Sequence, residues 1–392
     1  MKEERMKVLF WPGWWYPNRR DPIDGIFIKK HAEAVSRFCD VSVLYICSDP
    51  ALKDCIYEQE YLEEDGIPTL RIYIKPPPNI PLIRKFIDVL RYMKAGRRGL
   101  QFLKEKHGRP DIVHVHVNPP AGLVFLLFTR LRGIPFIHTE HWTGYLETSG
   151  KYRGLFRTWL TRRFIKRAKA VTPVSKDLRS AMEKHKLRSR YQIIPNVVDT
   201  DLFCIDAEKK RGADGKKRII HVSGLRPVKN VKGLLTTIKR LSEMRDDFEL
   251  YIVGNGPDRE ALEKTAQDLG LRDTFVFFTG RKSVEEVARY MKGGHFFVLF
   301  SDFENSPCVI DEAMACGLPI ITTDVGGIAE HVNSSNGILI NAQDNQALYD
   351  AINHMLDNYD KYDQEKIRKY AVSHFSYPII GETFYQLYRE VL

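Results

Sequence analysis

The feature that most constrains the fold of this chain is a regular alternation of short β-branched and aromatic runs with longer stretches of helical periodicity. Such alternation is typical of parallel strands connected by helical crossovers. It occurs twice, so we expect an α/β protein with two Rossmann-like, doubly wound domains whose parallel sheets face each other across a cleft. The expected strands are 7–10, 41–46, 70–74, 112–115, 136–138, 170–172 and 192–194 in the first half, and 218–222, 249–253, 275–278, 296–300, 320–322 and 337–340 in the second.

The length of 392 residues also favours two domains, because single hydrophobic cores stop growing at about 250–300 residues. The segment Pro195–Asp199, followed by the polar stretch 206–217, marks the boundary. We therefore predict domains at 1–198 and 199–372. Residues 373–392 carry apolar side chains at helical spacing and should form a terminal helix that returns to the first domain.

Charge is distributed unevenly between the two halves. Residues 1–200 hold 36 Lys and Arg against 21 Asp and Glu, whereas residues 201–392 hold 24 against 29.

Segment 84–104 mixes cations with an apolar stripe and is expected to be a helix interrupted near Gly96 and Gly99. Segment 151–169 carries eight cations and no acid. Such surfaces attract anionic lipid at about 1 kcal/mol per cation, so an anionic membrane surface is the expected partner. A solvated surface that only aids solubility is the alternative. Few aromatic residues interleave with the cations, which argues against nucleic acid.

Several observations favour a cytoplasmic protein, peripheral on the inner face of the cell membrane. The acidic, charged N-terminus does not resemble a signal peptide. The longest apolar run, Ala121–Phe128, is shorter than the roughly 18–20 residues that cross a bilayer. The six cysteines form no C-x-x-C pair, which indicates free thiols.

The densest local signal is the segment 300–319, in which a buried strand leads through a loop into a helix. Ser306 is expected to cap this helix, Pro307 to occupy its first position and Gly317 to end it. This junction lies at the carboxyl end of a strand, where open α/β sheets bind ligands, and first-turn N–H groups suit phosphate. The candidate donor-binding residues are Ser306, Pro307, Cys308, Val309 and Glu312, with Glu304 in the preceding loop. The alternative is that both acids are ordinary helix-start and surface residues.

The spacing of Glu304 and Glu312 resembles the E-x7-E signature of glycosyltransferase family 4, retaining enzymes of the GT-B fold that include bacterial envelope-glycan glycosyltransferases. Asn305-Ser306 stands where that family commonly has Gly-Phe. The resemblance implies transfer of a hexosyl group from a UDP- or GDP-sugar to a hydroxyl. The basic segments of the first half, if they bind a membrane, suggest a glycan or polyprenyl-linked acceptor.

Segment 221–233 resembles the family segment whose Arg and Lys bind the donor diphosphate. Gly224 stands where the family usually has its Arg, so we assign Arg226 and Lys229, with Lys232 as the alternative lysine. Fixed cations beside a diphosphate stabilise the leaving-group charge. The alternative is a pair of surface cations at a helix start.

The resemblance implies further site residues. Gly254 and Gly256 form a turn that could lie close to the ligand, Arg281 lies near the base, and residues 323–330 frame the site. In the first domain the Gly25 loop is near the donor, and His141 matches a histidine placed near the donor sugar. His114 and His116 are expected to pack in the core. No metal is expected, because no His, Cys or Asp cluster has metal-ligand spacing, and no other cofactor is expected because the nucleotide-sugar is itself a co-substrate.

Two other functions remain open from the sequence alone. A sugar-nucleotide epimerase could use the same fold, but the E-x7-E match argues against it. A non-catalytic basic binding protein would leave the diphosphate residues unexplained.

Overall fold

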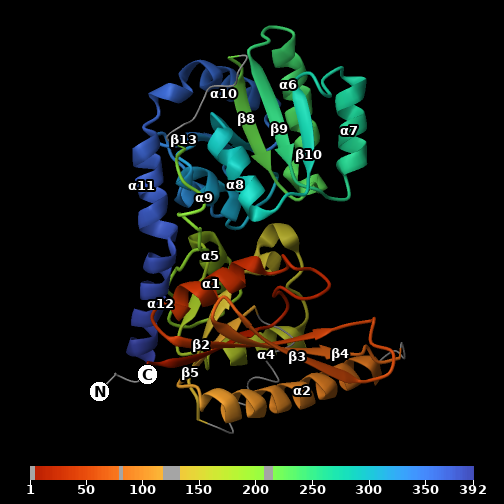
Figure 1. Ribbon diagram of the computed structural model, residues 1–392, viewed down its shortest axis with the longest axis vertical. Coiled ribbons are helices and arrows are strands. Elements are labelled where there is room, and N and C mark those ends of the chain that lie inside the picture. The colour runs from red at the N-terminus through yellow and green to blue at the C-terminus, as the bar shows by residue number, and fades with distance from the viewer. Residues whose placement is uncertain (1–4, 79–82, 118–132, 207–214) are drawn as a thin grey trace. The chain divides into compact units, whose positions relative to one another are not determined.

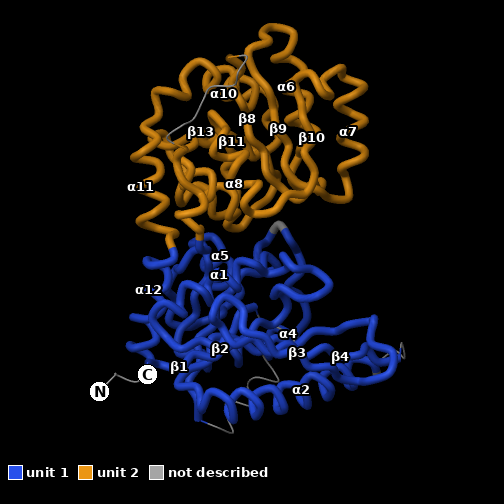
Figure 2. The backbone as a smooth tube through the Cα atoms, in the orientation of Figure 1, with its two compact units in different colours: residues 1–197, 377–392 blue, residues 198–376 orange. Residues whose placement is uncertain are grey.

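The computed structural model describes residues 5–78, 83–117, 133–206 and 215–392. The chain divides into two compact units, residues 1–197 with 377–392 (unit 1) and residues 198–376 (unit 2), coloured separately in Figure 2. The sequence analysis placed these boundaries after residues 198 and 372. Two predicted segments lie outside the described residues: the apolar run at 121–128 and most of the polar stretch at 206–217. The cleft between the two units stays a prediction.

Unit 1 contains a seven-stranded sheet in the order β3-β4-β2-β1-β5-β6-β7. All neighbours are parallel except β3 and β4, which form an antiparallel pair at the edge. The strands are β1 Lys7–Pro12, β2 Asp40–Ser48, β3 Tyr57–Glu64, β4 Ile67–Ile74, β5 Ile112–His116, β6 Phe136–Glu140 and β7 Val171–Pro173.

Two strand assignments from sequence were wrong. The acid-rich strand β3 was missed, because an edge strand tolerates a polar sequence that carries no run of apolar residues. The strand expected at 192–194 does not form, and Tyr191 makes only an isolated bridge with Val171.

Helices α1 and α2 pack over β2 and β4 from opposite sides of this sheet (Figure 1). The helix α2 runs without a break through Gly96 and Gly99, so the predicted interruption was wrong. A Cβ atom on Gly99 would lie 2.4 Å from Leu44 Cδ1, so this glycine permits close contact between helix and sheet. The unit 1 helices are α1 Ile26–Ser36, α2 Ile83–His107, α4 Leu155–Ile165, α5 Lys176–Lys184 and α12 Tyr377–Val391.

The terminal helix α12 packs along α1. A Cβ atom on Gly381 would lie 2.1 Å from the carbonyl oxygen of Ala34, and Tyr377 donates a hydrogen bond of 2.6 Å to Glu33. The last residues of the chain therefore complete the core of unit 1.

Unit 2 contains a six-stranded, wholly parallel sheet in the order β10-β9-β8-β11-β12-β13. Apolar clusters cover both of its faces. The strands are β8 Lys217–Val222, β9 Phe248–Val253, β10 Val276–Gly280, β11 Phe296–Leu299, β12 Ile320–Thr323 and β13 Gly337–Ile340. The helices are α6 Val231–Ser242, α7 Arg259–Asp268, α8 Val284–Gly293, α9 Cys308–Ala315, α10 Asn345–Asn358 and α11 Gln364–Phe375.

Both sheets have the doubly wound strand order that the sequence pattern predicted. In unit 2 the order reverses between β8 and β11, and in unit 1 between β1 and β5. Open α/β sheets bind ligands at the carboxyl ends of the strands beside such a reversal. A ligand site is therefore expected at these two places.

Two further predictions can be compared with the structure. All six cysteines are free thiols. Within the described ranges, no helix combines the length and hydropathy needed to cross a membrane.

Candidate active site

A lysine–carboxylate pair lies at the reversal of the unit 2 sheet. Lys229 Nζ is 2.5 Å from Glu304 Oε1, and Ser301 Oγ donates to the same oxygen at 2.7 Å. The loops that carry these residues are tied together, because the N–H of Asp302 donates to the carbonyl of Val228 at 2.8 Å. Glu304 is 8% exposed, so its carboxylate is fixed where the loops after β8 and β11 meet.

The two other candidate cations lie on the same segment but are exposed. Arg226 immediately precedes the short 3-10 helix Pro227–Lys229, and Lys232 lies in the first turn of α6. Of the two candidate lysines, Lys229 is the one whose salt bridge joins it to Glu304.

The start of α9 differs from the prediction. Ser306 does not cap the helix and Pro307 is not its first residue; Pro307 is itself the N-cap, with φ −75° and ψ 108°, and the helix begins at Cys308. The reason is that the carbonyl of Pro307 is the acceptor for the N–H of Ile310 at 3.0 Å, while its ψ lies outside the helical range. The expected end of the helix is confirmed, since Gly317 follows the last turn with φ +71°.

Helix α9 buries two successive acids, Asp311 and Glu312, which are 3% and 8% exposed. Burial, together with the charge of Glu312, raises the pKa of Asp311 well above its usual range. Asp311 was not predicted from the sequence, because its burial and raised pKa arise from packing.

The glycines of the β9 loop serve the contact between two loops. A Cβ atom on Gly254 would lie 2.0 Å from the carbonyl oxygen of Ser223, and one on Gly256 would lie 2.2 Å from that of Leu225. They therefore let the β9 loop pack on the segment that leads to Arg226. The N–H of Gly254 donates to the carbonyl of Gly280, next to the exposed Arg281.

The loop after β12 supports the Glu304 loop directly. Gly326 has φ +58°, and its Cβ would lie 2.0 Å from the carbonyl oxygen of Glu304. The N–H of Gly327 donates to the carbonyl of Asn305 at 2.8 Å. The turn at 323–330 is thus a structural support for the candidate carboxylate.

In unit 1, Gly25 and His141 lie near the reversal between β1 and β5. Gly25 precedes α1 with φ +63°, and a Cβ there would lie 2.4 Å from the backbone of Trp15. The N–H groups of His141 and Trp142 both donate to Glu140 Oε1, at 3.0 and 2.9 Å. The acid that ends β6 thereby fixes the backbone of the His141 loop.

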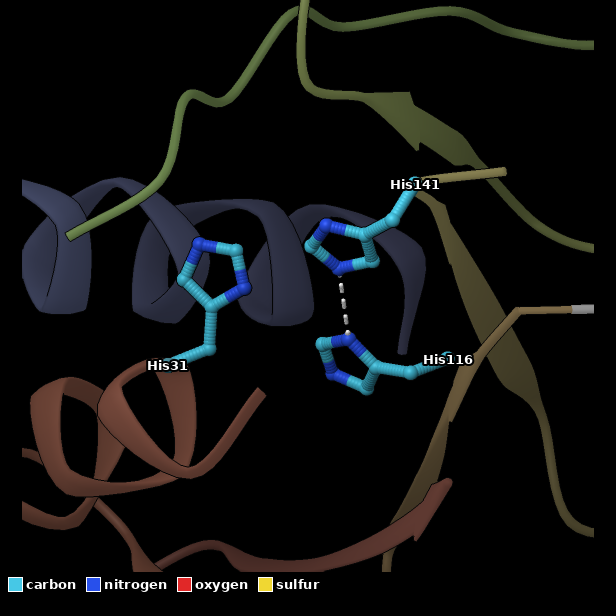
Figure 3. A group of neighbouring side chains, drawn as sticks. All are labelled: His31, His116 and His141. Carbon is cyan, nitrogen blue, oxygen red and sulfur yellow. Dashed lines mark hydrogen bonds between the residues drawn. The ribbon is translucent and has the colours of Figure 1, made fainter. Parts of the chain in front are cut away.

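Three histidines from separate elements converge there, as Figure 3 shows. His116 Nδ1 and His141 Nε2 are hydrogen-bonded at 3.3 Å, and His31 Nε2 donates to the carbonyl of Pro195 at 3.0 Å. One nitrogen from each ring lies within 4.8 Å of the others, so this is the group that could hold a metal ion among the described residues. Burial lowers the pKa of His31 to about 4 and those of His116 and His141 well below their usual range.

Sequence spacing could not reveal this group, because its members come from α1, β5 and the loop after β6. His114 is also buried, and its two ring nitrogens bond Tyr388 and Thr139 at 2.7 and 2.6 Å. His114 thus has the packing role that the sequence analysis expected, whereas His116 contacts a candidate site residue.

Two doubly wound sheets of this strand order in one chain are the architecture of the GT-B glycosyltransferases. The family model "Glycosyltransferase Family 4" matches residues 31–202, and "Glycosyl transferases group 1" matches residues 205–373. The chain therefore belongs to glycosyltransferase family 4.

Comparisons with individual proteins agree with this assignment. The chain is 25% identical over 393 residues to the putative teichuronic acid biosynthesis glycosyltransferase TuaC of Bacillus subtilis, covering 97% of this chain and 95% of that protein. Its fold is similar to that of sucrose-phosphate synthase from Thermosynechococcus elongatus, with a TM-score of 0.77, 20% identity and 99% of both chains covered. It is also similar to HepE from Anabaena in complex with UDP, with a TM-score of 0.75, 19% identity, and 98% of this chain and 100% of that chain covered.

Proposed function

We propose that the protein is a retaining glycosyltransferase that transfers a hexosyl group from a UDP- or GDP-sugar to a hydroxyl of a glycan or polyprenyl-linked acceptor. The observation that carries the proposal is the Lys229–Glu304 pair at the reversal of the unit 2 sheet. A cation and a carboxylate at this position suit the two ends of a nucleotide-sugar, its diphosphate and its hydroxyls.

The donor chemistry follows from the charges in the unit 2 loops. Arg226 and Lys229 bind the diphosphate and stabilise the negative charge that grows on it as the glycosidic bond breaks. The backbone N–H groups of the first turn of α9 face the same end of the sheet and add anion stabilisation. Because two cations supply this charge, we propose that transfer needs no metal ion.

The remaining donor contacts follow the family resemblance. Glu304 and Glu312 accept hydrogen bonds from sugar and ribose hydroxyls, and Arg281 lies near the base. His141, neutral and fixed by Glu140, contacts the donor sugar. A neutral imidazole suits a hydroxyl, because its Nδ1 can donate or accept a hydrogen bond while its Nε2 is bonded to His116.

The proposed reaction retains the configuration of the anomeric carbon. The acceptor hydroxyl attacks from the face on which the diphosphate leaves, the bond between C1 and the phosphate oxygen breaks, and the bond between C1 and the acceptor oxygen forms. The hydroxyl proton passes to the departing phosphate oxygen. No protein nucleophile takes part.

The helix α4 supports the proposal of a peripheral protein on the inner face of the membrane. Leu155, Phe156 and Trp159 are 92%, 69% and 53% exposed, and the last two rings stack at 6.1 Å. Arg163 lies over the Trp159 ring at 5.4 Å, within a segment that carries eight cations. An apolar face beside cations suits an anionic lipid surface.

The name of TuaC, which refers to teichuronic acid biosynthesis, supports an envelope acceptor, and the UDP bound to HepE supports a uridine donor.

The decisive experiment measures the release of UDP from UDP-sugars and of GDP from GDP-sugars, with and without an extract of envelope lipids. We expect release that depends on the extract and a product whose anomeric configuration, read by NMR, matches the donor. Conversion of the donor into an epimeric nucleotide-sugar, or failure to bind any nucleotide, would contradict the proposal.

A further inference from the structure

A groove opens in unit 1 at the carboxyl ends of β1, β2 and β4, with the N-terminal half of α2 as its other wall. Its volume is about 550 Å³, within the usual range of about 300–1,000 Å³ for ligand sites. It lies at the carboxyl ends of the strands, the edge at which open α/β sheets bind ligands, on the β2 and β4 side of the reversal between β1 and β5. None of the residues assigned above to the donor lines it.

The walls of the groove are mainly apolar. Ile46, Cys47 and Ile74 come from the strand ends, Trp14 from the loop after β1, and Val89 and Tyr92 from α2. The hydroxyl of Tyr92 accepts a hydrogen bond of 3.0 Å from Trp11 Nε1, so part of its hydrogen-bonding capacity is used within the protein. These walls match a hydrocarbon chain and offer little to a sugar.

The exposed part of the lining carries charge from the first turns of α2. Arg84 and Lys85 are both exposed, and Asp88 lies 4.0 Å from the Arg84 guanidinium. The net charge of these three side chains is positive, which favours an anionic group at this position. Next to them on α2, Phe86 and Leu90 are 65% and 48% exposed, so apolar surface extends outward from the groove.

One wall of the groove contacts the loop that carries His141. The ring of Trp14 packs edge-on against Trp142 at 5.7 Å, and Trp142 directly follows His141. A ligand seated against Trp14 would therefore lie beside a loop that the family resemblance assigns to the site.

We propose that this groove binds the hydrocarbon part of a phosphate-bearing lipid, with Arg84 and Lys85 pairing with the phosphate. That the lipid is the acceptor rests on the proposed function, whereas the binding itself does not. The apolar walls suit a hydrocarbon chain, and the two cations at the first turn of α2 suit an anion. A ligand that carries both parts should therefore bind more tightly than phosphate or hydrocarbon alone.

The test uses the full chain and dodecyl phosphate below its micelle concentration, with dodecanol and inorganic phosphate as the two partial ligands. Binding is followed by the change in tryptophan fluorescence. We expect dodecyl phosphate to bind more tightly than either partial ligand. The double substitution Arg84→Glu, Lys85→Glu should weaken the binding of dodecyl phosphate about tenfold or more. Val89→Asp should also weaken this binding, because it places a charge in the apolar wall of the groove.

The matched control is Lys94→Glu with Arg97→Glu, which makes the same change of charge on the same helix at two exposed positions that do not line the groove. It should leave binding unchanged, and thermal unfolding checks that every variant is folded. Equal binding of dodecyl phosphate to all variants, or no preference over inorganic phosphate, would overturn the proposal. So would a concentration-dependent dimer that the groove variants abolish, because a second copy would then occupy the groove.

Nucleotide-sugar binding is measured on the same samples. If the donor binds and the groove variants change nothing, the groove proposal fails and the proposed function stands. If dodecyl phosphate binds as expected but no nucleotide-sugar does, the lipid site stands and the proposed function fails.

Discussion

At the scale of single residues, the central feature is that Lys229 and Glu304 fix each other at the reversal of the unit 2 sheet. We expect Lys229→Met to lower kcat/KM by about 10²–10³-fold, because a cation beside a developing negative charge contributes mainly in the transition state. Initial rates of nucleotide release measure the effect. Lys232→Met is the control, since Lys232 is exposed on the adjoining helix. A larger loss for Lys232→Met than for Lys229→Met would reverse the assignment.

A second prediction concerns Gly326, which supports Glu304 through the backbone. Gly326→Ala should lower activity, because its Cβ would lie 2.0 Å from the Glu304 carbonyl oxygen. Gly270→Ala is the matched control: Gly270 also has a left-handed conformation, φ +68°, but nothing lies within 4 Å of a Cβ there. Both variants should lose about 1 kcal/mol of stability from backbone strain. Equal activity in the two variants would show that the Glu304 loop does not depend on this contact.

Residues in a local motif could be predicted, and those brought together by the fold could not. Glu304, Glu312 and Lys229 follow strands at characteristic spacing, so the sequence pointed to them. The group of His31, His116 and His141 depends on three separate elements, and the raised pKa of Asp311 depends on burial. Ser306 was given a capping role that Pro307 has, because only the hydrogen bonds define where the helix begins.

At the scale of elements, α4 carries the prediction of membrane binding. Replacing Leu155, Phe156 and Trp159 with serine should weaken sedimentation with anionic vesicles at least tenfold, because burying each of these side chains in lipid contributes about 1.5–3 kcal/mol. Met244→Ser is the control, as Met244 is 78% exposed in unit 2. Vesicle binding that survives the triple substitution, or that is equal for neutral and anionic vesicles, would contradict the role of α4.

The elements themselves were predicted where the pattern was apolar and missed where it was not. The buried strands were found by their β-branched runs, whereas β3 is an edge strand with a polar sequence. Glycine suggested a break in α2, but at Gly99 the missing side chain serves contact with β2. The low helix propensity of glycine is thus overridden where a helix packs closely on a sheet.

At the scale of the whole molecule, buried neutral histidines set the dependence of stability on pH. Burial lowers the pKa of His31 and of His221 to about 4, and it lowers the pKa values of His114, His116 and His141 well below their usual range. Unfolding releases these rings to an ordinary pKa of about 6.5, so below that pH the unfolded state binds more protons. Their contribution is full above pH 6.5 and is lost as the pH falls towards 4.

From these side chains we expect the melting temperature to fall between pH 7.5 and pH 5, with a loss of about 2 kcal/mol at pH 5 from each of His31 and His221. The raised pKa of Asp311 acts in the opposite direction, but it is one group against five histidines. Thermal unfolding across this range measures it. His221→Gln should flatten the curve, while substitution of the exposed His354 should not change its shape. A melting temperature that stays constant or rises on acidification would contradict the buried, neutral state of these side chains.

The proposed function requires the unit 2 loops to bind the diphosphate of a nucleotide-sugar through Arg226 and Lys229. Thermal unfolding of the wild type and the Arg226→Met, Lys229→Met variant with UDP-, GDP- and ADP-sugars tests this claim. At a hundred times its Kd, a bound ligand stabilises the folded state by about 2.7 kcal/mol. We predict a clear rise in Tm of the wild type with a UDP- or GDP-sugar and none in the variant. An equal rise in both proteins, or no rise with any nucleotide-sugar, would contradict the claim.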